Sequence, residues 1–470
     1  MPDLCVIGAG SAGLSVAAGA VQMGASVVLI ERGRMGGDCL NAGCVPSKAL
    51  IAAAQRMADA RAAGAFGITA TASADFAAVH KHVHDVIAAI APHDSVERFE
   101  GLGVTVISST ARFVSPVEVE AGGQRIRARR FVIATGSQPF IPPIPGLGDA
   151  PYLTNETIFE LAERPRHLIV IGGGPIGCEL AQAFVRLGAQ VSVVEALTLL
   201  GKDEPAHADV VRQRLAADGV ALHESAKVAA VAGAAGNLVV TLEPSGGARH
   251  EIAGSHLLVA VGRRPVIADL GLDAAGVSVE NGAIKVDTRL RTSNERVFAI
   301  GDCIGGPQFT HVAGYHAGIV VRQALFRMPA NVDYKALPRV TYTDPELASV
   351  GMSETEARRI YAGKIRILES TFAENDRARA ERAAEGAIKV IVGPRGRILG
   401  ASIVGRHAGE LIHPWVLAIA NGLKIAAMAT MIAPYPTLGE ISKRAAGSFY
   451  TPALYGKATR MLVRFLRMFG

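Results

Sequence analysis

Two cysteines within residues 36–48 have the spacing and surroundings of a redox-active dithiol. Cys39 and Cys44 stand five positions apart in the sequence Gly-Gly-Asp-Cys-Leu-Asn-Ala-Gly-Cys-Val-Pro-Ser-Lys. A disulfide between them would close so short a loop that it removes little entropy from the unfolded chain, so its use is chemical rather than structural. Pro46 suits the first turn of a helix over residues 45–63, and the positive end of that helix favours Cys44 as a thiolate.

Two other segments repeat the pattern of a dinucleotide-binding unit. In each, an apolar strand leads into a glycine-rich turn and a helix, and a second strand ends at a glutamate. The residues concerned are Gly8, Gly10, Gly13 and Glu31 in the first segment, and Gly172, Gly174, Gly177 and Glu195 in the second. Such glycines let backbone N–H groups approach a pyrophosphate, and the glutamate bonds a ribose hydroxyl. The repeat distance, Gly8 to Gly172, is 164 residues, and two units imply two bound dinucleotides.

The second unit predicts NAD rather than NADP. A carboxylate at Glu195 bonds a free 2′-hydroxyl and repels a 2′-phosphate. An NADP site would place an arginine near this strand end, and residues 196–200 contain none.

Composition indicates a large α/β protein. The 470 residues suffice for about three domains, and 50% hydrophobic residues with 52 glycines suit closely packed layers. Only five cysteines are present, which predicts a reducing compartment, by default the cytoplasm. We expect no signal peptide, and the apolar stretch over residues 414–431, interrupted by polar residues, is predicted to be buried helix. A net charge of +6 without a basic stripe argues against a nucleic-acid partner.

The segment over residues 76–99 is predicted to be one helix, with strands following over 104–113 and 126–133. The helix carries four histidines, and His80 and His84 share a face at i, i+4. Because no third ligand is evident nearby in the sequence, we expect a solvated polar face and no metal site.

The cysteine stretch resembles the signature of the FAD-dependent pyridine nucleotide-disulfide oxidoreductases, the family of lipoamide dehydrogenase, glutathione reductase and mercuric reductase. The resemblance extends to about Pro452 and implies an α/β fold with two Rossmann-like domains, the second inserted in the first, and a C-terminal α+β domain that forms a homodimer. The implied domains are residues 1–150 and 270–334 for FAD, 151–269 for NAD(P), 335–455 for dimerisation, and a basic amphipathic tail over 456–470.

The resemblance also implies residue roles, with FAD on the first unit and NAD on the second. Cys44 would face the flavin, and Cys39 would exchange with substrate. Lys48 and Glu179 hold the family's positions for an ion pair beside the flavin. Further implied FAD contacts are Thr110, Ala111, Thr135, Gly136, Gly301, Asp302 and the packing residue His311; Gly262 is an implied contact on the nicotinamide side.

Two residues depart from the family pattern. In lipoamide dehydrogenase and glutathione reductase a histidine enters the partner's active site and pairs with a glutamate five positions on; here Tyr435 takes its place and Glu440 remains. A phenol near pKa 10 would cost about 4 kcal/mol to use as a base at neutral pH. Asp38 stands where threonine is common, and it should raise the pKa of the Cys39 thiol.

Three functions are compatible with these residues. The leading hypothesis is an FAD-dependent homodimer that moves electrons between NAD(H) and a thiol-disulfide substrate, as dihydrolipoyl dehydrogenase does. The second is a mercuric-reductase-like metal-ion or quinone reductase, although mercuric reductases use a C-terminal cysteine pair and this chain has no cysteine after Cys303. The third is a membrane-associated redox sensor, because residues 457–469 alternate basic and apolar side chains like an interfacial helix. A cap on the dimer surface explains this tail equally well.

Overall fold

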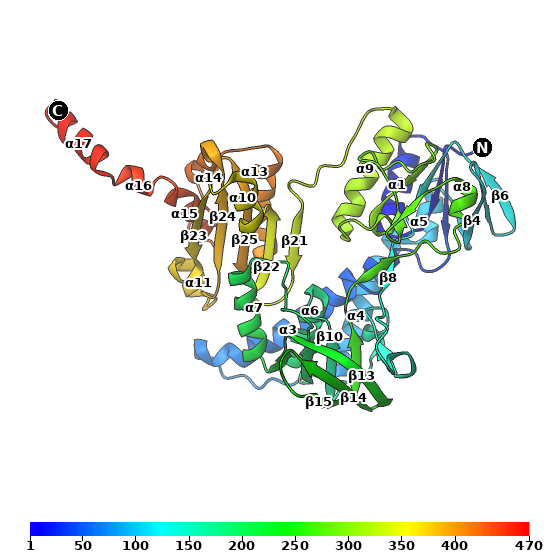
Figure 1. Ribbon diagram of the computed structural model, residues 1–470, viewed down its shortest axis with the longest axis horizontal. Helices are drawn as coiled ribbons and strands as arrows, with labels where there is room; N and C mark the ends of the chain where they lie inside the picture. Colours follow the sequence, from blue (N-terminus) through cyan, green and yellow to red (C-terminus); the bar gives the residue numbers. More distant parts are fainter. Residues whose placement is uncertain (470) are drawn as a thin grey trace. The chain divides into compact units, whose positions relative to one another are not determined.

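The computed structural model describes residues 1–469 and confirms the predicted α/β class (Figure 1). The chain forms two compact units, each assembled from separate stretches of sequence. The first unit contains residues 1–172, 186–194 and 226–332, and the second contains residues 173–185, 195–225 and the chain from residue 333 onward.

The first unit contains a parallel five-stranded sheet in the order β20-β7-β1-β2-β3. Its strands are β1 (Leu4–Ile7), β2 (Val27–Glu31), β3 (Thr105–Ser108), β7 (Arg130–Ile133) and β20 (Val297–Ala299). Both faces are buried: along β1, Leu4 and Val6 pack with helices α1 (Ser11–Gln22) and α9 (Thr310–Phe326), whereas Cys5 and Ile7 belong to the opposite core cluster. Such a sheet presents the carboxyl ends of its strands at one edge, where ligands bind in this class of fold.

A second parallel group in the same unit has the order β11-β10-β16-β9. Its strands are β9 (Tyr152–Leu153), β10 (His167–Ile171), β11 (Gln190–Val194) and β16 (His256–Val259). An antiparallel sheet follows, made of β13 (Ala226–Ala234), β14 (Asn237–Pro244) and β15 (His250–Gly254). A two-stranded ribbon pairs β8 (Ser137–Pro139) with β17 (Arg263–Pro265). Other short elements of this unit include α8 (Leu272–Ala275), β18 (Val279–Glu280) and β19 (Ala283–Ile284).

Each of the two long strands predicted after the histidine helix is in fact two strands of different sheets. Strand β3 belongs to the parallel sheet, whereas β4 (Ala111–Ser115), β5 (Glu118–Ala121) and β6 (Gln124–Arg127) form a separate antiparallel meander. The chain turns between β3 and β4 after Ser109, whose N–H donates to Glu31 O at 2.8 Å. The mixed apolar and polar residues over 104–113 do not reveal such a corner.

The predicted helix over residues 76–99 is also divided. It consists of α4 (Phe76–Ile90), a 3-10 turn (Ala91–Asp94) and α5 (Val96–Gly101). Pro92 cannot donate a helical hydrogen bond, and the Ser95 hydroxyl caps α5 by accepting from Arg98 N at 3.2 Å. His93 therefore lies outside the helix that carries the other histidines.

The second unit is built on an antiparallel sheet in the order β21-β22-β25-β24-β23. Its strands are β21 (Pro338–Thr341), β22 (Glu346–Gly351), β23 (Arg366–Thr371), β24 (Ala387–Val392) and β25 (Ile398–Gly405). The helices of this unit include α6 (Pro175–Arg186), α7 (Pro205–Ala217), α10 (Glu354–Tyr361), α11 (Asp376–Ala380), α12 (Ala408–Leu411), α13 (His413–Ala420), α14 (Ile425–Thr430) and α15 (Glu440–Ser448), with the short strand β12 (Val220–His223). The stretch over residues 414–431 is thus two helices, separated where Gly422 adopts a φ of +63°.

The C-terminal tail forms α16 (Thr451–Leu454) and the predicted amphipathic helix, α17 (Lys457–Leu466). Figure 1 shows both helices extending away from the sheet of the second unit, and the large apolar side chains of α17 are exposed. Across residues 1–469, none of the helices combines the length and apolar character needed to span a bilayer. Contact of α17 with a membrane surface, or with a second subunit, stays a prediction.

Candidate redox site

The dithiol loop lies directly against the first glycine-rich turn. Gly36 N–H donates to Ala9 O at 2.9 Å, and helix α2 (Gly37–Asn41) begins at the next residue. Gly37 has a φ of +58°, and a Cβ atom there would lie 2.6 Å from the Cα atom of Gly10. Only glycine fits such a contact, so the loop that carries Cys39 is held against the turn predicted to bind FAD.

The two reactive thiols form one hydrogen-bonded group. Helix α3 (Cys44–Ala62) begins at Cys44, and Cys44 Sγ lies 3.3 Å from Thr310 Oγ1. The Cys39 thiol donates to Cys44 and is the main cause that lowers the pKa of Cys44 to about 6; Thr310 and the Lys48 charge lower it further, against burial. The same hydrogen bond, followed by burial, raises the pKa of Cys39. Cys44 is therefore a thiolate at neutral pH, as predicted, with the Cys39 hydrogen bond as the leading cause.

The other three cysteines are enclosed. Cys5, Cys178 and Cys303 each have no exposed side-chain surface, and burial raises the pKa of each thiol. Thiols in such surroundings are inert. Cys39 and Cys44 are thus the accessible pair among the five cysteines of the chain.

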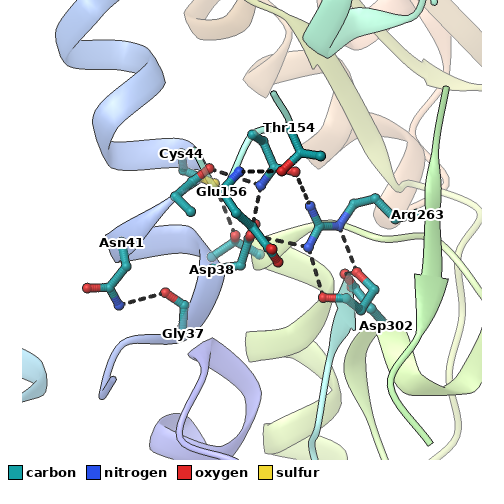
Figure 2. A network of polar contacts seen from close by, with 12 residues as sticks. Gly37, Asp38, Asn41, Cys44, Thr154, Glu156, Arg263 and Asp302 are labelled. Atoms are coloured by element: carbon teal, nitrogen blue, oxygen red, sulfur yellow. Dashed lines mark hydrogen bonds and ion pairs between the residues drawn. The ribbon is translucent and has the colours of Figure 1, made fainter. Parts of the chain in front are cut away.

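Asp38 is part of a polar network that the sequence did not reveal (Figure 2). Its Oδ1 atom lies 3.2 Å from the guanidinium of Arg263, whose side chain is only 12% exposed. Arg263 also donates to the Ser137 hydroxyl at 2.8 Å and to Asn155 Oδ1 at 3.0 Å. Asn155 in turn donates to Asp38 at 2.9 Å and to Ala42 O at 3.0 Å. Asp38 is therefore a paired carboxylate that holds the dithiol loop, and Arg263 and Asn155 are site residues that the sequence reading missed.

The network continues to Asp302, one of the implied FAD contacts. The Ser137 hydroxyl donates to Asp302 Oδ2 at 2.6 Å, and burial raises the pKa of this carboxyl. Gly301 N–H donates to Nδ1 of His316, which is almost fully buried and whose pKa burial lowers to about 4. A neutral imidazole at position 316 thus fixes the backbone that positions Asp302, a second contribution that the sequence reading missed.

Removing the charge of Asp38 tests its electrostatic effect on the thiols. We predicted that Asp38 acts on Cys39, but its carboxylate is instead among the groups that raise the pKa of Cys44. We expect Asp38→Asn to lower the pKa of Cys44 by less than about one unit, because Arg263 already screens the charge. The pH dependence of iodoacetamide alkylation of the reduced enzyme measures this shift, with Asp94→Asn as a matched control. A rise in the pKa of Cys44 would contradict the assignment.

The first glycine-rich turn fits a pyrophosphate. Gly8 has a φ of +104°, and a Cβ atom at Gly13 would lie 1.8 Å from Gly8 O. Gly10 is the N-cap of α1 and brings no side-chain cap, so the first-turn N–H groups are available to an anion. At the end of β2, Glu31 accepts from Ala9 N at 2.6 Å. The hydrogen bond between Ala9 and Glu31 thus places the predicted ribose-binding carboxylate beside the predicted pyrophosphate-binding turn.

The second turn repeats this geometry bond for bond. Gly172 has a φ of +112°, and Glu195 accepts from Gly173 N at 2.8 Å and from Leu197 N at 2.9 Å. The positions 164 residues earlier make the same two hydrogen bonds, at 2.6 and 2.7 Å. The internal repeat therefore extends from the sequence spacing to the hydrogen bonds of the two carboxylates. Gly174 faces open space, as a backbone contact to a ligand would need.

Two other predicted FAD contacts, Thr110 and Ala111, follow strand β3, and a third, His311, lies on helix α9. The bond from Ser109 N to Glu31 O brings Thr110 and Ala111 beside the end of β2. On α9, His311 stacks on Phe309 with ring centroids 5.1 Å apart, consistent with its predicted packing role.

The segment after β7 contains β8 and pairs with β17, the strand that follows β16. Thr135 donates its hydroxyl proton to Val266 O at 2.6 Å, and Gly136 has a φ of +68°. Gly262 accepts from Phe140 N at 2.9 Å, and a Cβ atom on it would meet no atom within 4 Å. These contacts place Gly262 on the chain segment that pairs with the one carrying Thr135 and Gly136.

Lys48 and Glu179 are positioned separately. Lys48 lies one turn beyond Cys44 on α3, and its charge helps lower the pKa of that thiol. Glu179 is buried on α6 and accepts from Tyr342 N at 2.9 Å. The ion pair between Lys48 and Glu179 stays a prediction.

Tyr435 is exposed over 70% of its surface, and its hydroxyl donates to Asp376 Oδ2 at 3.1 Å. The hydrogen bond and charge of Asp376, with a further contribution from Glu440, raise the pKa of the phenol. Glu440 accepts from Thr437 N at 3.3 Å at the start of α15. Asp376, 59 residues from Tyr435 in the sequence, was not among the predicted site residues.

These features define an oxidoreductase in which a low-pKa thiolate and a second thiol lie against a dinucleotide-binding turn. The chain belongs to the pyridine nucleotide-disulphide oxidoreductase family: residues 2–317 match that family and residues 337–446 match its dimerisation domain. It is an FAD-dependent NAD(P)H-disulfide oxidoreductase, which confirms the predicted enzyme class, and its dimerisation domain supports a homodimer.

Curated relatives with different substrates match almost the whole chain. A mercuric reductase of Streptomyces lividans is 37% identical over 457 residues, covering 95% of this chain and 96% of the relative. A dihydrolipoyl dehydrogenase of Bacillus subtilis (strain 168) is 35% identical over 451 residues, covering 93% and 96%. Among solved structures, the Cu(II) complex of the HOCl-induced flavoprotein disulfide reductase RclA from Escherichia coli matches with a TM-score of 0.84 and 28% identity, covering 94% of this chain and 98% of that one.

Proposed function

We propose that this enzyme uses NADH to reduce the Cys39–Cys44 disulfide and that the resulting dithiol reduces a thiophilic metal ion, Hg(II) or Cu(II). Bound FAD would supply the two-electron relay between the nicotinamide and the disulfide. By family resemblance, residues 1–150 and 270–334 would bind FAD, residues 151–269 NAD, and residues 335–455 would form the dimer. The five-cysteine composition supports the cytoplasm as the location.

The observation that carries the choice of acceptor is the environment of Tyr435. Oxidation of a dithiol substrate needs a base that takes a thiol proton near neutral pH, and the family's histidine is suited to it. The Tyr435 hydroxyl instead donates to Asp376, and the neighbouring carboxylates raise its pKa. A phenol held in its neutral form is a poor base, whereas reduction of a metal ion by the enzyme's own thiolate needs no base to deprotonate a substrate thiol.

Atoms and electrons balance in the proposed cycle, with NADH as the electron donor, the two cysteines as carriers and the metal ion as the acceptor. Hydride equivalents from NADH break the S–S bond, leaving Cys39 as a thiol, Cys44 as a thiolate, and NAD⁺. One Hg(II) or two Cu(II) ions then accept the two electrons, the S–S bond re-forms, and the Cys39 proton is released. The pKa of about 6 at Cys44 keeps a metal-binding thiolate present at neutral pH.

A steady-state comparison of acceptors tests the proposal. The holoenzyme would be assayed with NADH and Hg(II), Cu(II), glutathione disulfide or a quinone, and in the opposite direction with dihydrolipoamide and NAD⁺. We expect kcat/KM for a metal ion to exceed that for dihydrolipoamide by at least about tenfold, a cautious fraction of the roughly 10²- to 10⁴-fold that a positioned base contributes. Faster turnover of dihydrolipoamide would reject the metal-ion proposal and leave the leading sequence hypothesis.

Dihydrolipoamide oxidation is the second candidate, favoured by the retained Glu440 and by the Bacillus subtilis relative. It leads to a prediction at Tyr435. We expect Tyr435→His to oxidise dihydrolipoamide at least about tenfold faster near pH 7, because an imidazole five residues before Glu440 restores the family's base.

The control is Tyr435→Phe, which removes the hydroxyl while keeping the ring. It should leave stopped-flow reduction of the enzyme by NADH unchanged. If this variant loses turnover with the best acceptor while Tyr435→His gains nothing, the hydroxyl itself takes part in the reaction.

A further inference from the structure

Three potential metal ligands converge on the surface away from the dithiol. His80 and His84 project from α4, and Glu160 comes from the 3-10 turn Ile158–Glu160. Their ligand atoms all lie within 4.8 Å of one another, with His84 Nε2 and Glu160 Oε2 3.8 Å apart. The sequence predicts no metal site here, because it shows no third ligand near the two histidines. Folding supplies that ligand from a position 76 residues beyond His84 in the chain.

We propose that His80, His84 and Glu160 bind one divalent transition-metal ion of the Ni²⁺, Cu²⁺ and Zn²⁺ group. Two imidazoles and one carboxylate are the donor set that these ions prefer, and three protein ligands leave one position for water. Metal–ligand bonds of about 2.0–2.1 Å in a tetrahedral site separate neighbouring ligand atoms by about 3.3 Å. The proposal requires the three side chains to rotate so that separations of up to 4.8 Å shrink to that value.

The backbone on both sides of the cluster is fixed by buried residues. On α4, Val83 is 2% exposed and lies between the two histidines in sequence. On the turn, Ile158 and Phe159 are 1% and 7% exposed and directly precede Glu160. His84 Nε2 lies 3.3 Å from Phe159 O, so its ring already faces the turn. An ion would therefore meet ligands held on two anchored elements rather than on mobile loops.

The proposed site is connected to the dithiol loop through one short segment. Ile158 N–H donates to Thr154 O at 3.0 Å. This hydrogen bond closes a turn that contains Asn155 and ends two residues before the metal ligand Glu160. Asn155 donates to both Asp38 and Ala42. Binding at the surface would thus stiffen the segment that holds the dithiol loop.

Equilibrium dialysis of Zn²⁺ against the oxidised FAD-loaded enzyme tests the site, because the disulfide form presents no competing thiolate. We expect one Zn²⁺ per chain in the wild type and in His82→Gln, a matched control on the exposed opposite side of α4. His80→Gln, His84→Gln and Glu160→Gln should each weaken binding by about tenfold or more, since each removes a ligand. Equal binding by the wild type and the His80→Gln/His84→Gln double variant would overturn the proposal.

Hydrogen exchange measured by mass spectrometry gives a second readout, which reports on the segment that carries Glu160. Zn²⁺ should slow exchange in a peptide covering residues 154–160 in the wild type and in His82→Gln. The same peptide should exchange equally with and without Zn²⁺ in His84→Gln. Protection that persists in His84→Gln would place the ion elsewhere and reject the three-ligand site.

Discussion

Replacing Cys44 by serine should abolish turnover, with a loss of at least about 10³-fold, because it removes the thiolate that forms half of the redox pair. It should also remove a long-wavelength absorption band that we expect from a Cys44 thiolate beside the flavin in the two-electron-reduced enzyme. With a pKa lowered to about 6, the thiolate is present above that pH and is lost as the pH falls through it. The band of the wild type should therefore titrate with a midpoint near pH 6.

Cys39→Ser is the informative partner variant. Turnover should again be lost, but the band should survive, because a serine hydroxyl can donate to Cys44 in place of the Cys39 thiol. Cys5→Ala, at a fully buried position of the core, should keep both the band and the activity. A band that persists in Cys44→Ser would reverse the assignment of the two thiols.

NADH should exceed NADPH in kcat/KM by about 10- to 150-fold, equivalent to roughly 1–3 kcal/mol. The 2′-phosphate of NADPH would meet the Glu195 carboxylate, whose two oxygens are already held by Gly173 and Leu197. This carboxylate cannot turn away without giving up both hydrogen bonds. Stopped-flow reduction of the enzyme with each nucleotide isolates the effect from the later steps.

Glu195→Gln should reduce the preference for NADH over NADPH, because the substitution removes the negative charge while the glutamine amide oxygen can still accept a backbone hydrogen bond. Reoxidation of the dithiol by the acceptor should be unaffected, since that half-reaction does not involve the nicotinamide. A wild-type enzyme that favours NADPH would reject Glu195 as the selecting residue.

The elements that could be predicted from the sequence are those with local patterns. Strands β1 and β10 lead into the two glycine-rich turns as predicted, and the 164-residue repeat appears in the hydrogen bonds of both glutamates. The helix start at Cys44 was predicted to within one residue from Pro46. In each of these cases, neighbouring residues decide the conformation.

The residues that were missed owe their roles to contacts between distant segments. Arg263 contacts Asp38, which lies 225 positions away in the sequence. The one feature of the sequence that could have indicated Arg263 is its position directly after Gly262, an implied contact on the nicotinamide side. Asn155, Asp376 and Glu160 lie in ordinary polar surroundings in the sequence and become site residues only when the chain folds. The same reason explains the divided strands, because a local residue pattern does not show to which sheet each half belongs.

The contact between Gly37 and Gly10 limits how the chain can diverge. A Cβ atom at Gly37 would lie 2.6 Å from the Cα atom of Gly10, whereas ordinary contacts lie at 3.4–4 Å, so an alanine at Gly37 would force the two loops apart by about 1 Å. That displacement would move both the glycine-rich turn predicted to bind FAD and the loop that carries Cys39. Mutational tolerance at the two positions is therefore interdependent: a library that varies either loop alone should return glycine, and only paired backbone changes can open the junction to other residues.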